Sequence, residues 1–372
     1  MSDDATGVDL LYSEVEEELR ASVRALLARK ASAEAVLGRC ESAEPYDPAL
    51  WRALAADLGL AGLAVPEADG GAGAGWREVA VVMEELGRSV APVPYLGGAV
   101  LGTAALLAAG AGGLLPDVAG GRRVAVLAVP LTSGPGAALP ATVAADGAGV
   151  LRGRVTSVAD ALVADVLLVP ARDADGVAGL YAVAAGDVEI VRRTSLDLTR
   201  PVAHVLLDGA HGQLVAAGEL AEAAVRRALL VGAGMLASEQ LGIAEWCLAT
   251  TVAYVRERRQ FGRAVGSFQA LKHRLADLWL EVVGARAAAR YAAATLAADD
   301  PDAEVAVAVA QAYCGALAVW AAEECIQLHG GIGMTWEHPA HLYLKRAKAD
   351  QLALGTPGHH RAELGRLVGV NP

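Results

Sequence analysis

The segment YVRERRQFGRAVGSFQALKHRLADLWLE, residues 254–281, combines an arginine cluster, a Phe-Gly break and the start of an amphipathic helix. A second segment, EECIQLHGGIGMTWEHPAHLYLKRAKA from residue 323, ends a helix at Gln327 and continues into a Gly-Gly turn. Such a turn leaves backbone N–H groups available to an anion. Taken alone, the two segments fit a surface arginine patch and an ordinary helix end equally well, so their meaning depends on the chain around them.

That chain has 372 residues, which is too long for one compact core and predicts two or three domains. Its composition is 54% hydrophobic but only 4% aromatic, with two phenylalanines, so its apolar mass is mainly Ala, Val and Leu and favours closely packed helices. The net charge of −12 argues against a general polyanion-binding protein, and no nucleic-acid partner is expected. A local anion site remains compatible with this charge.

Hydrophobic periodicity changes twice along the chain. The first third has helical patterns separated by Gly, Pro and Asp, with Asp47 as an N-cap before Pro48. Short β-branched runs follow from about residue 122 to 207, and long Ala/Leu helices occupy the remainder. The expected helices cover residues 13–29, 48–58, 76–87, 99–109, 218–257, 267–298, 302–329 and 338–350. This order predicts helices, then an all-β middle, then a helical bundle.

Several classes of site and location are not expected. Four well-separated cysteines without a CxxC pair predict neither a disulfide framework nor a zinc site. Neighbours on a helix do not face the same way, so we expect His359 and His360 to be a solvated pair and no metal to be bound. The acidic N-terminus lacks the pattern of a secretion signal, which predicts a cytoplasmic protein.

One uncharged stretch, between Arg88 and Asp117, is long enough to span a bilayer. Pro92, Pro94 and several glycines interrupt it, so a continuous apolar helix could cover only residues 99–109. We therefore expect a buried helix and no membrane contact.

Together, the two quoted segments resemble the acyl-CoA dehydrogenase family, which carries an Arg-x-x-Phe-Gly element and a Gln-x-x-Gly-Gly element in its C-terminal bundle. The resemblance continues in LWRALAADLGLAGLAVPEADGGAGAGWREVAVVMEELGRSVAPVPYL, residues 50–96, and in SLDLTRPVAHVLLDGA, residues 195–210, and covers nearly the whole chain. It implies an α+β multi-domain fold: an N-terminal helical domain at 1–120, a middle β-barrel domain at 121–217 and a C-terminal four-helix bundle at 218–372. It also implies an FAD-dependent oxidoreductase that removes a proton from Cα and a hydride from Cβ of an acyl-CoA thioester, with a glutamate as base.

In this family each FAD lies at a dimer interface, and the neighbouring chain contacts its ADP half. The resemblance implies that this chain keeps the neighbour-supplied residues. They are Arg258, Gln260, Phe261, Phe268, Gln269, Gln327, Gly330 and Gly331. A guanidinium such as that of Arg258 suits a pyrophosphate, and Phe261 offers an apolar face.

The residues that a chain supplies to its own flavin are mostly replaced. Where the family has a Thr-Glu-Pro-Gly-x-Gly-Ser loop, this sequence has residues 128–134, AVPLTSG, in which only Pro130 matches. Counting along the chain puts Ser157 and Ala159 at the two ends of the family's Trp-x-Thr, so the aromatic cover of the flavin ring is missing.

The base is missing as well. The family places its glutamate at one of two positions, which correspond here to Leu354 and Gly232, and no catalytic residue is assigned. Leucine cannot accept a proton. The residue after Gly232, where the family has a CoA-binding arginine, is Ala233, and Glu239 lies two helical turns beyond Gly232.

This division predicts an obligate heteromer in which the chain completes the FAD site of a homologous acyl-CoA dehydrogenase chain that carries the glutamate. It is similar to the heterotetramers of actinobacterial steroid degradation, whose substrates are CoA thioesters of side chains or ring fragments. The family's usual electron acceptor is an electron-transferring flavoprotein. Two alternatives stay open: an active homotetramer with Asp350 or Glu239 as a relocated base, and a flavin-free scaffold that binds a protein or acyl-carrier partner.

Overall fold

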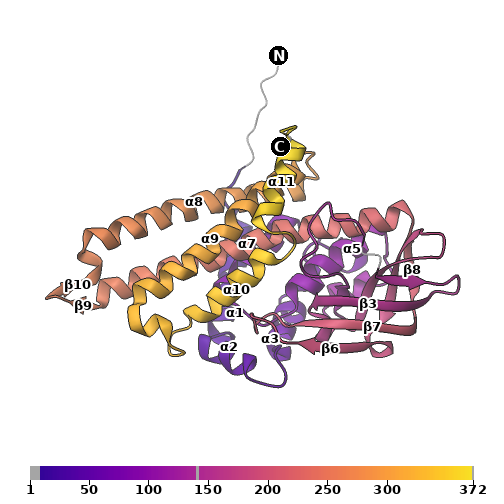
Figure 1. The fold of residues 1–372 in the computed structure, drawn as a ribbon, viewed down its shortest axis with the longest axis horizontal. Coiled ribbons are helices and arrows are strands. Elements are labelled where there is room, and N and C mark those ends of the chain that lie inside the picture. The colour runs from indigo at the N-terminus through magenta and orange to yellow at the C-terminus, as the bar shows by residue number, and fades with distance from the viewer. Residues whose placement is uncertain (1–8, 140–141, 371–372) are drawn as a thin grey trace, which may run out of the picture.

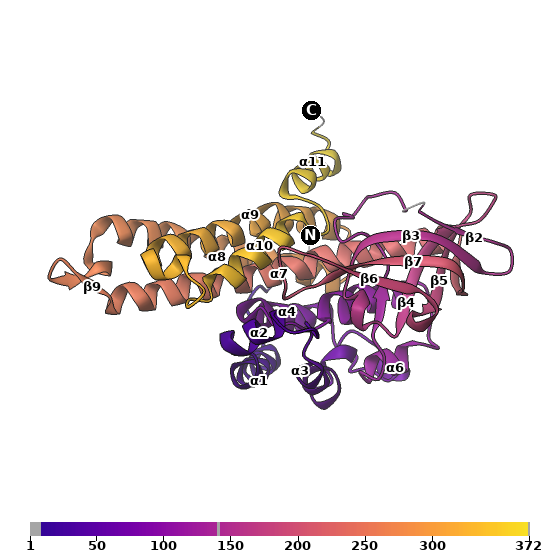
Figure 2. The ribbon, with the colours of Figure 1, turned by 60° about the horizontal axis from the view of Figure 1, so that its bottom comes forward.

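The computed structural model describes residues 9–139 and 142–370 (Figure 1). Long helices run along the longest axis of the molecule, with the strands at one end and the short hairpin β9–β10 at the other. The remaining helices, from the N-terminal third, lie along one side of this assembly (Figure 2). The expected order of helices, strands and helical bundle is confirmed.

The N-terminal third consists of short helices whose starts follow local capping rules. They are α1 Glu14–Lys30, α2 Ala33–Cys40, α3 Pro48–Arg52, α4 Trp76–Ser89, α5 Thr103–Ala108 and α6 Leu115–Ala119. The predicted N-cap is confirmed, because Oδ1 of Asp47 accepts hydrogen bonds from the backbone N–H groups of Ala49 at 3.0 Å and Leu50 at 2.9 Å. The periodicity did not predict α2 or α6.

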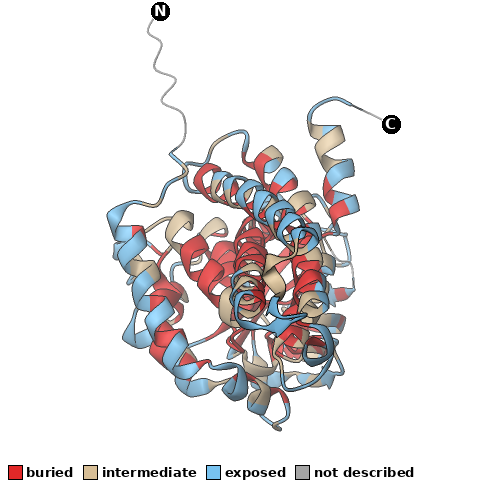
Figure 3. Ribbon diagram, turned by 90° about the vertical axis from the view of Figure 1, so that its left-hand side faces the viewer, coloured by how far each residue is buried: buried red, intermediate tan, exposed pale blue. Residues whose placement is uncertain are grey.

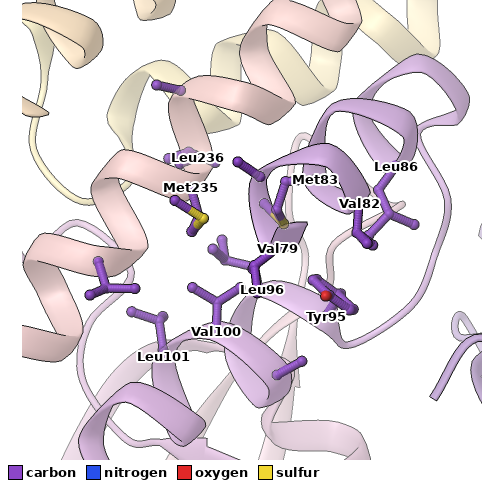
Figure 4. Close-up of a cluster of buried hydrophobic side chains, with 14 of the residues drawn as sticks. Val79, Val82, Met83, Leu86, Tyr95, Leu96, Val100, Leu101, Met235 and Leu236 are labelled. Atoms are coloured by element: carbon purple, nitrogen blue, oxygen red, sulfur yellow. The ribbon is translucent and has the colours of Figure 1, made fainter. Parts of the chain in front are cut away.

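The uncharged stretch after α4 is buried, as expected. It forms the π-helical segment η4, Tyr95–Gly102, which continues into α5, and every residue of η4 is buried. Val79 and Met83 of α4 and Met235 of α7 close around η4 in the core (Figure 4). A Cβ on Gly102 would lie 1.8 Å from the carbonyl oxygen of Ala125, so only glycine permits this approach to the first strand.

The middle of the chain forms one eight-stranded sheet with the order β6-β7-β3-β2-β4-β5-β8, in which β1 pairs with β4 in parallel. The strands are β1 Ala125–Leu127, β2 Val143–Ala145, β3 Val150–Ala159, β4 Val166–Arg172, β5 Ala178–Ala184, β6 Glu189–Arg193, β7 Val202–His211 and β8 Gln213–Ala217. A separate apolar core, containing Leu151, Leu167 and Val205, fills one face of this sheet. The β-branched runs predicted all but β2 and β8.

The C-terminal part contains the four expected helices and one more. They are α7 Glu219–Glu257, α8 Gln269–Ala297, α9 Ala303–His329, α10 Ala340–Leu352 and the additional α11 Pro357–Leu367. The short strands β9 Arg259–Gln260 and β10 Arg263–Ala264 connect α7 to α8. Viewed along the bundle, its centre is buried and its outer surface is largely exposed (Figure 3).

One helix of this bundle is apolar enough to be mistaken for a membrane span. The segment Ala303–Met334, which is α9 with the turn after it, meets the length and hydropathy requirements, but 67% of its most apolar window is buried inside the fold. It packs against α7, α8, α10 and α11. We therefore interpret it as the core helix of the bundle.

Candidate functional site

A groove of about 720 Å³ opens at the end of the bundle that carries the hairpin β9–β10. The C-terminal ends of α7 and α9, the hairpin and the first turn of α8 surround it. Seven of the eight predicted cofactor-binding residues line this groove: Arg258, Gln260, Phe261, Phe268, Gln327, Gly330 and Gly331. The eighth, Gln269, is the exposed first residue of α8 and is not part of the lining.

The hairpin holds an aromatic ring out into solvent. Phe261 and Gly262 form its two-residue turn with φ values of 53° and 78°, which is the conformation that matches the twist of the flanking strands. Phe261 is 88% exposed and meets Phe268 edge to face, with ring centroids 6.1 Å apart. The guanidinium of Arg263 covers Phe268 at 3.9 Å from the ring centroid. An exposed aromatic residue at this position favours contact with a ligand or another chain.

Arg258 is the uncompensated cation of the groove. Its backbone N–H ends α7 by donating to the carbonyl of Tyr254 at 2.9 Å, and no carboxylate pairs with its side chain among the residues described. The other arginine of the lining, Arg274, is paired with Glu324 at 2.6 Å. Arg258 is therefore the side chain available to an anion.

The Gly-Gly turn closes the groove after α9. Gly330 adopts φ 64° and ψ −137°, a conformation that is essentially restricted to glycine. The structure adds three polar lining side chains that the motifs did not indicate, namely Tyr254, Arg274 and His329. Tyr254 precedes Arg258 by one helical turn, and this spacing in the sequence could have indicated that both side chains face the groove.

The loop 128–134 and the positions 157 and 354, where the sequence departs from the family pattern, also come together, in a second region of the fold. Leu131 of the loop 128–134 is hydrogen-bonded to Ser157 and to Leu354. Its N–H donates to the carbonyl of Ser157 at 3.0 Å. The carbonyl of Leu131 in turn accepts from the N–H of Leu354 at 2.7 Å. Three segments that the sequence analysis singled out separately therefore form one contiguous region.

The two alternative base positions converge within this region. A Cβ added to Gly232 would lie 3.1 Å from Cδ1 of Leu354 and 2.4 Å from Cδ2 of Leu101. Both leucines are buried, so apolar side chains fill the space that either glutamate would occupy. No proton acceptor is provided at this point of the fold.

The position expected for the aromatic cover is an irregularity in β3. Ser157 has φ 53° and lies where the pairing of β3 with β7 shifts register, and its N–H donates to Nδ1 of His204 at 3.1 Å. The expectation of a solvated histidine pair was wrong for His360, which is buried with Nε2 2.9 Å from the carbonyl of Leu354. His359 is exposed, as expected. His360 therefore holds the segment around Leu354 in place.

Glu239 belongs to a buried ion cluster and not to an open pocket. Its carboxylate accepts hydrogen bonds from Arg200, at 2.5 Å, and from Arg346. Arg346 also donates to Asp197 at 2.6 Å, so the cluster ties α7 and α10 to the loop before β7. Burial alone would raise the pKa of Glu239, but the two guanidinium groups outweigh burial and lower it. A carboxylate held in this way is a structural counter-ion.

Asp350 is the third acidic group on these two arginines. Its Oδ1 accepts from Arg200 at 2.7 Å, while its buried Oδ2 has no hydrogen-bond partner. Burial, together with the Glu239 carboxylate, raises the pKa of Asp350 well above its ordinary range. Asp350 is buried with its Oδ1 engaged by Arg200, which disfavours the second relocated position as a base.

Because of this pKa shift, we expect the contribution of Asp350 to the free energy of unfolding to decrease as the pH rises. The unfolded carboxyl loses its proton near pH 4 and the folded one keeps it to higher pH, so its contribution decreases by about 1.4 kcal/mol per pH unit until the folded pKa is passed. Relative to Asp350→Asn, the unchanged chain should therefore lose stability between pH 5 and pH 8 in urea unfolding experiments. A constant difference between the two proteins over this range would contradict the assignment.

The two regions lie far apart within one chain. The groove is at the hairpin end of the bundle, whereas the sheet, whose strand β3 contains Ser157, is at the opposite end (Figures 1 and 2). The loop 128–134 connects this strand to Leu354, which follows α10. The molecule therefore combines a helical N-terminal part, a middle sheet and a C-terminal bundle with a groove at its hairpin end. This is the architecture of a flavoprotein dehydrogenase.

The chain belongs to the acyl-CoA dehydrogenase family. Residues 13–112 match the model of the acyl-CoA dehydrogenase N-terminal domain, and residues 222–368 match that of the C-terminal domain. The acyl-CoA dehydrogenase IpdE2 of Mycolicibacterium smegmatis is 37% identical over 95% of this chain and 98% of its own length. Its Mycobacterium tuberculosis namesake is 36% identical over 92% of this chain and 94% of its own length.

Solved structures agree with this assignment. The ChsE4-ChsE5 complex from Mycobacterium tuberculosis contains a chain 32% identical to this one with a TM-score of 0.85, and the match covers 98% of this chain and 100% of that one. A chain of a variant of the Tcur3481-Tcur3483 steroid ACAD is 33% identical with a TM-score of 0.84, covering 96% of this chain and 98% of that one. Members of this family are FAD-dependent oxidoreductases.

The residues present fit one half of FAD and not the other. The groove offers an unpaired guanidinium, an exposed aromatic ring and a glycine turn, which suit an ADP group. At the position expected for the aromatic cover of the flavin ring the chain has Ser157, and the loop 128–134 is hydrogen-bonded to the segment of Leu354.

Proposed function

We propose that this chain is the non-catalytic subunit of a heteromeric FAD-dependent acyl-CoA dehydrogenase, in which its groove completes the FAD site of a homologous partner that carries the glutamate base. The observation that carries the proposal is the apolar contact of Gly232, Leu354 and Leu101 at the two positions expected for the base, in a chain whose groove keeps the expected cofactor-binding residues. Such a chain would use the groove for a second chain's cofactor. FAD supplies the acceptor for the hydride from the acyl-CoA substrate.

The apolar filling of the base position supports the non-catalytic role. A member that abstracted the Cα proton itself would need an acceptor near Leu354 or Gly232, and leucine side chains meet there instead. Glu239 and Asp350, the two relocated candidates, are both buried among Arg200 and Arg346. This arrangement disfavours the alternative of an active homotetramer in which Glu239 or Asp350 is the base.

The heteromeric state and substrate class are inferred from relatives. The names of two matched structures describe a ChsE4-ChsE5 complex and a steroid ACAD with two differently named components. By analogy, we propose a heterotetramer with two kinds of chain, a CoA thioester of a steroid side chain or ring fragment as substrate, and an electron-transferring flavoprotein as acceptor.

The direct test is to purify the full chain alone and together with a homologous partner that retains the glutamate. We expect the chain alone to be folded but inactive in dye-linked oxidation of steroid CoA thioesters, and the pair to be active with one FAD per two chains. A pair in which the partner's glutamate is replaced by glutamine is the matched control and should bind FAD without turnover. Full FAD occupancy and turnover by the isolated chain would contradict the proposal.

A further inference from the structure

His329 is a buried imidazole at the end of α9 that lines the groove. It is 4% exposed, and its ring lies between those of Tyr254, with centroids 4.4 Å apart, and His338, with centroids 4.0 Å apart. Two aromatic neighbours therefore pack against the ring, and its nitrogens make the polar contacts. Neither quoted motif requires a histidine at this position.

The hydrogen bond on one edge determines which nitrogen is free to titrate. Nδ1 of His329 lies 2.7 Å from the carbonyl oxygen of Cys325, and because a carbonyl oxygen can only accept, Nδ1 carries a hydrogen. Nε2 has no partner among the residues described and is not enclosed, so it is the part of the side chain that reaches the groove. The fixed tautomer makes Nε2 an acceptor in the neutral ring and a donor in the protonated ring.

We propose that His329 is a further nucleotide-binding residue of the groove, whose protonated Nε2–H donates a hydrogen bond to an anionic pyrophosphate oxygen of the dinucleotide. This inference rests on the proposed function of the groove as the ADP half of a flavin site. The free guanidinium of Arg258 lies in the same lining, while Arg274 is already neutralised by Glu324. Arg258 and His329 would therefore share the charge of two phosphates.

Among the titratable groups in this cluster, His329 is the side chain whose charge changes near neutral pH. Burial lowers its pKa, but hydrogen bonds to the side chain and carbonyl of Cys325 outweigh burial and raise it above 6.5. Burial and the neighbouring His329 lower the pKa of His338 to about 4, so His338 stays neutral. Hydrogen bonds from Cys247 and His329 lower the pKa of Cys325 to about 5, whereas burial keeps the Cys247 thiol protonated. Tyr254 supplies the remaining polar group that faces the ring.

The probe should carry an ADP group whose own charge is constant between pH 6 and pH 8. ADP-ribose meets this requirement because both phosphates of its pyrophosphate are esterified, whereas the terminal phosphate of ADP titrates in this range. We expect ADP-ribose to bind the full chain roughly tenfold more tightly at pH 6 than at pH 8 in calorimetric titrations. In His329→Gln and in His329→Phe, which keeps the stacked ring, the change should be less than about twofold.

Two further variants separate the possible outcomes. His273→Gln changes an exposed histidine of α8 outside the groove lining and should keep the full pH dependence. Arg258→Ala should weaken binding at both pH values. If the His329 variants retain the full pH dependence while Arg258→Ala weakens binding, the role of His329 is wrong and the half-site stands. If the unchanged chain does not bind ADP-ribose at either pH, the proposed function of the groove itself is contradicted.

Discussion

Replacement of Glu239 by alanine is expected to destabilise the chain by about 3–5 kcal/mol, the largest effect of any single substitution considered for this fold. The carboxylate lies between two guanidinium groups that are themselves buried, those of Arg200 and Arg346. Its removal leaves at least one positive charge in the interior without compensation, and burial of an unpaired charge costs far more than the ion pair contributes. Urea unfolding at pH 7 measures this change.

A surface variant serves as the control for this prediction. Glu323→Ala removes an exposed carboxylate that pairs with Lys348 at 3.6 Å, and exposed pairs contribute at most about 1 kcal/mol. Loss of acyl-CoA oxidation in Glu239→Ala with unchanged unfolding would contradict the structural role and restore Glu239 as the base. Glu239→Gln keeps an oxygen acceptor for one arginine and should fall between the two alanine variants.

Replacement of Arg258 by alanine should remove FAD from the proposed heteromeric enzyme without unfolding the chain. Arg258 is exposed at the C-cap of α7, so its side chain contributes little to the fold, and no carboxylate in the described chain competes for it. A charge-assisted hydrogen bond to a phosphate contributes about 1.5–3 kcal/mol, which corresponds to a loss of roughly 10- to 150-fold in FAD affinity. Flavin absorbance retained after gel filtration measures the occupancy.

The adjacent arginine provides a matched control. Arg259 has the same charge and exposure on β9 but does not line the groove, so Arg259→Ala should retain FAD. Equal losses of FAD in the two variants would indicate a general charge effect and would contradict a specific contact by Arg258. Catalytic turnover should follow FAD occupancy in both proteins, because neither arginine lies near Leu131, Ser157 or Leu354.

Local patterns predicted most elements and missed those that depend on neighbours. Asp47 and Pro48 identify the start of α3 because a cap is a contact within one turn. Strand β2 has only three residues, Val143–Ala145, and its alternation is too short to detect before its partners are known. The predicted solvation of His360 failed for a related reason, since its ring packs on the turn before α11, beside Gly355 and with Nε2 2.9 Å from the carbonyl of Leu354.

The sequence by itself determined the order of helices, strands and bundle, the acyl-CoA dehydrogenase resemblance, and the absence of a glutamate at positions 232 and 354. These follow from residue types at fixed separations along the chain, which folding does not alter. Only the tertiary structure decided that Gly232, Leu354 and Leu101 meet at one apolar point, that Glu239 is neutralised by two arginines, and that seven of the eight expected cofactor-binding residues line one groove at the hairpin end of the bundle. Contacts between distant segments have no local signature, because they arise when separate amphipathic faces bury one another.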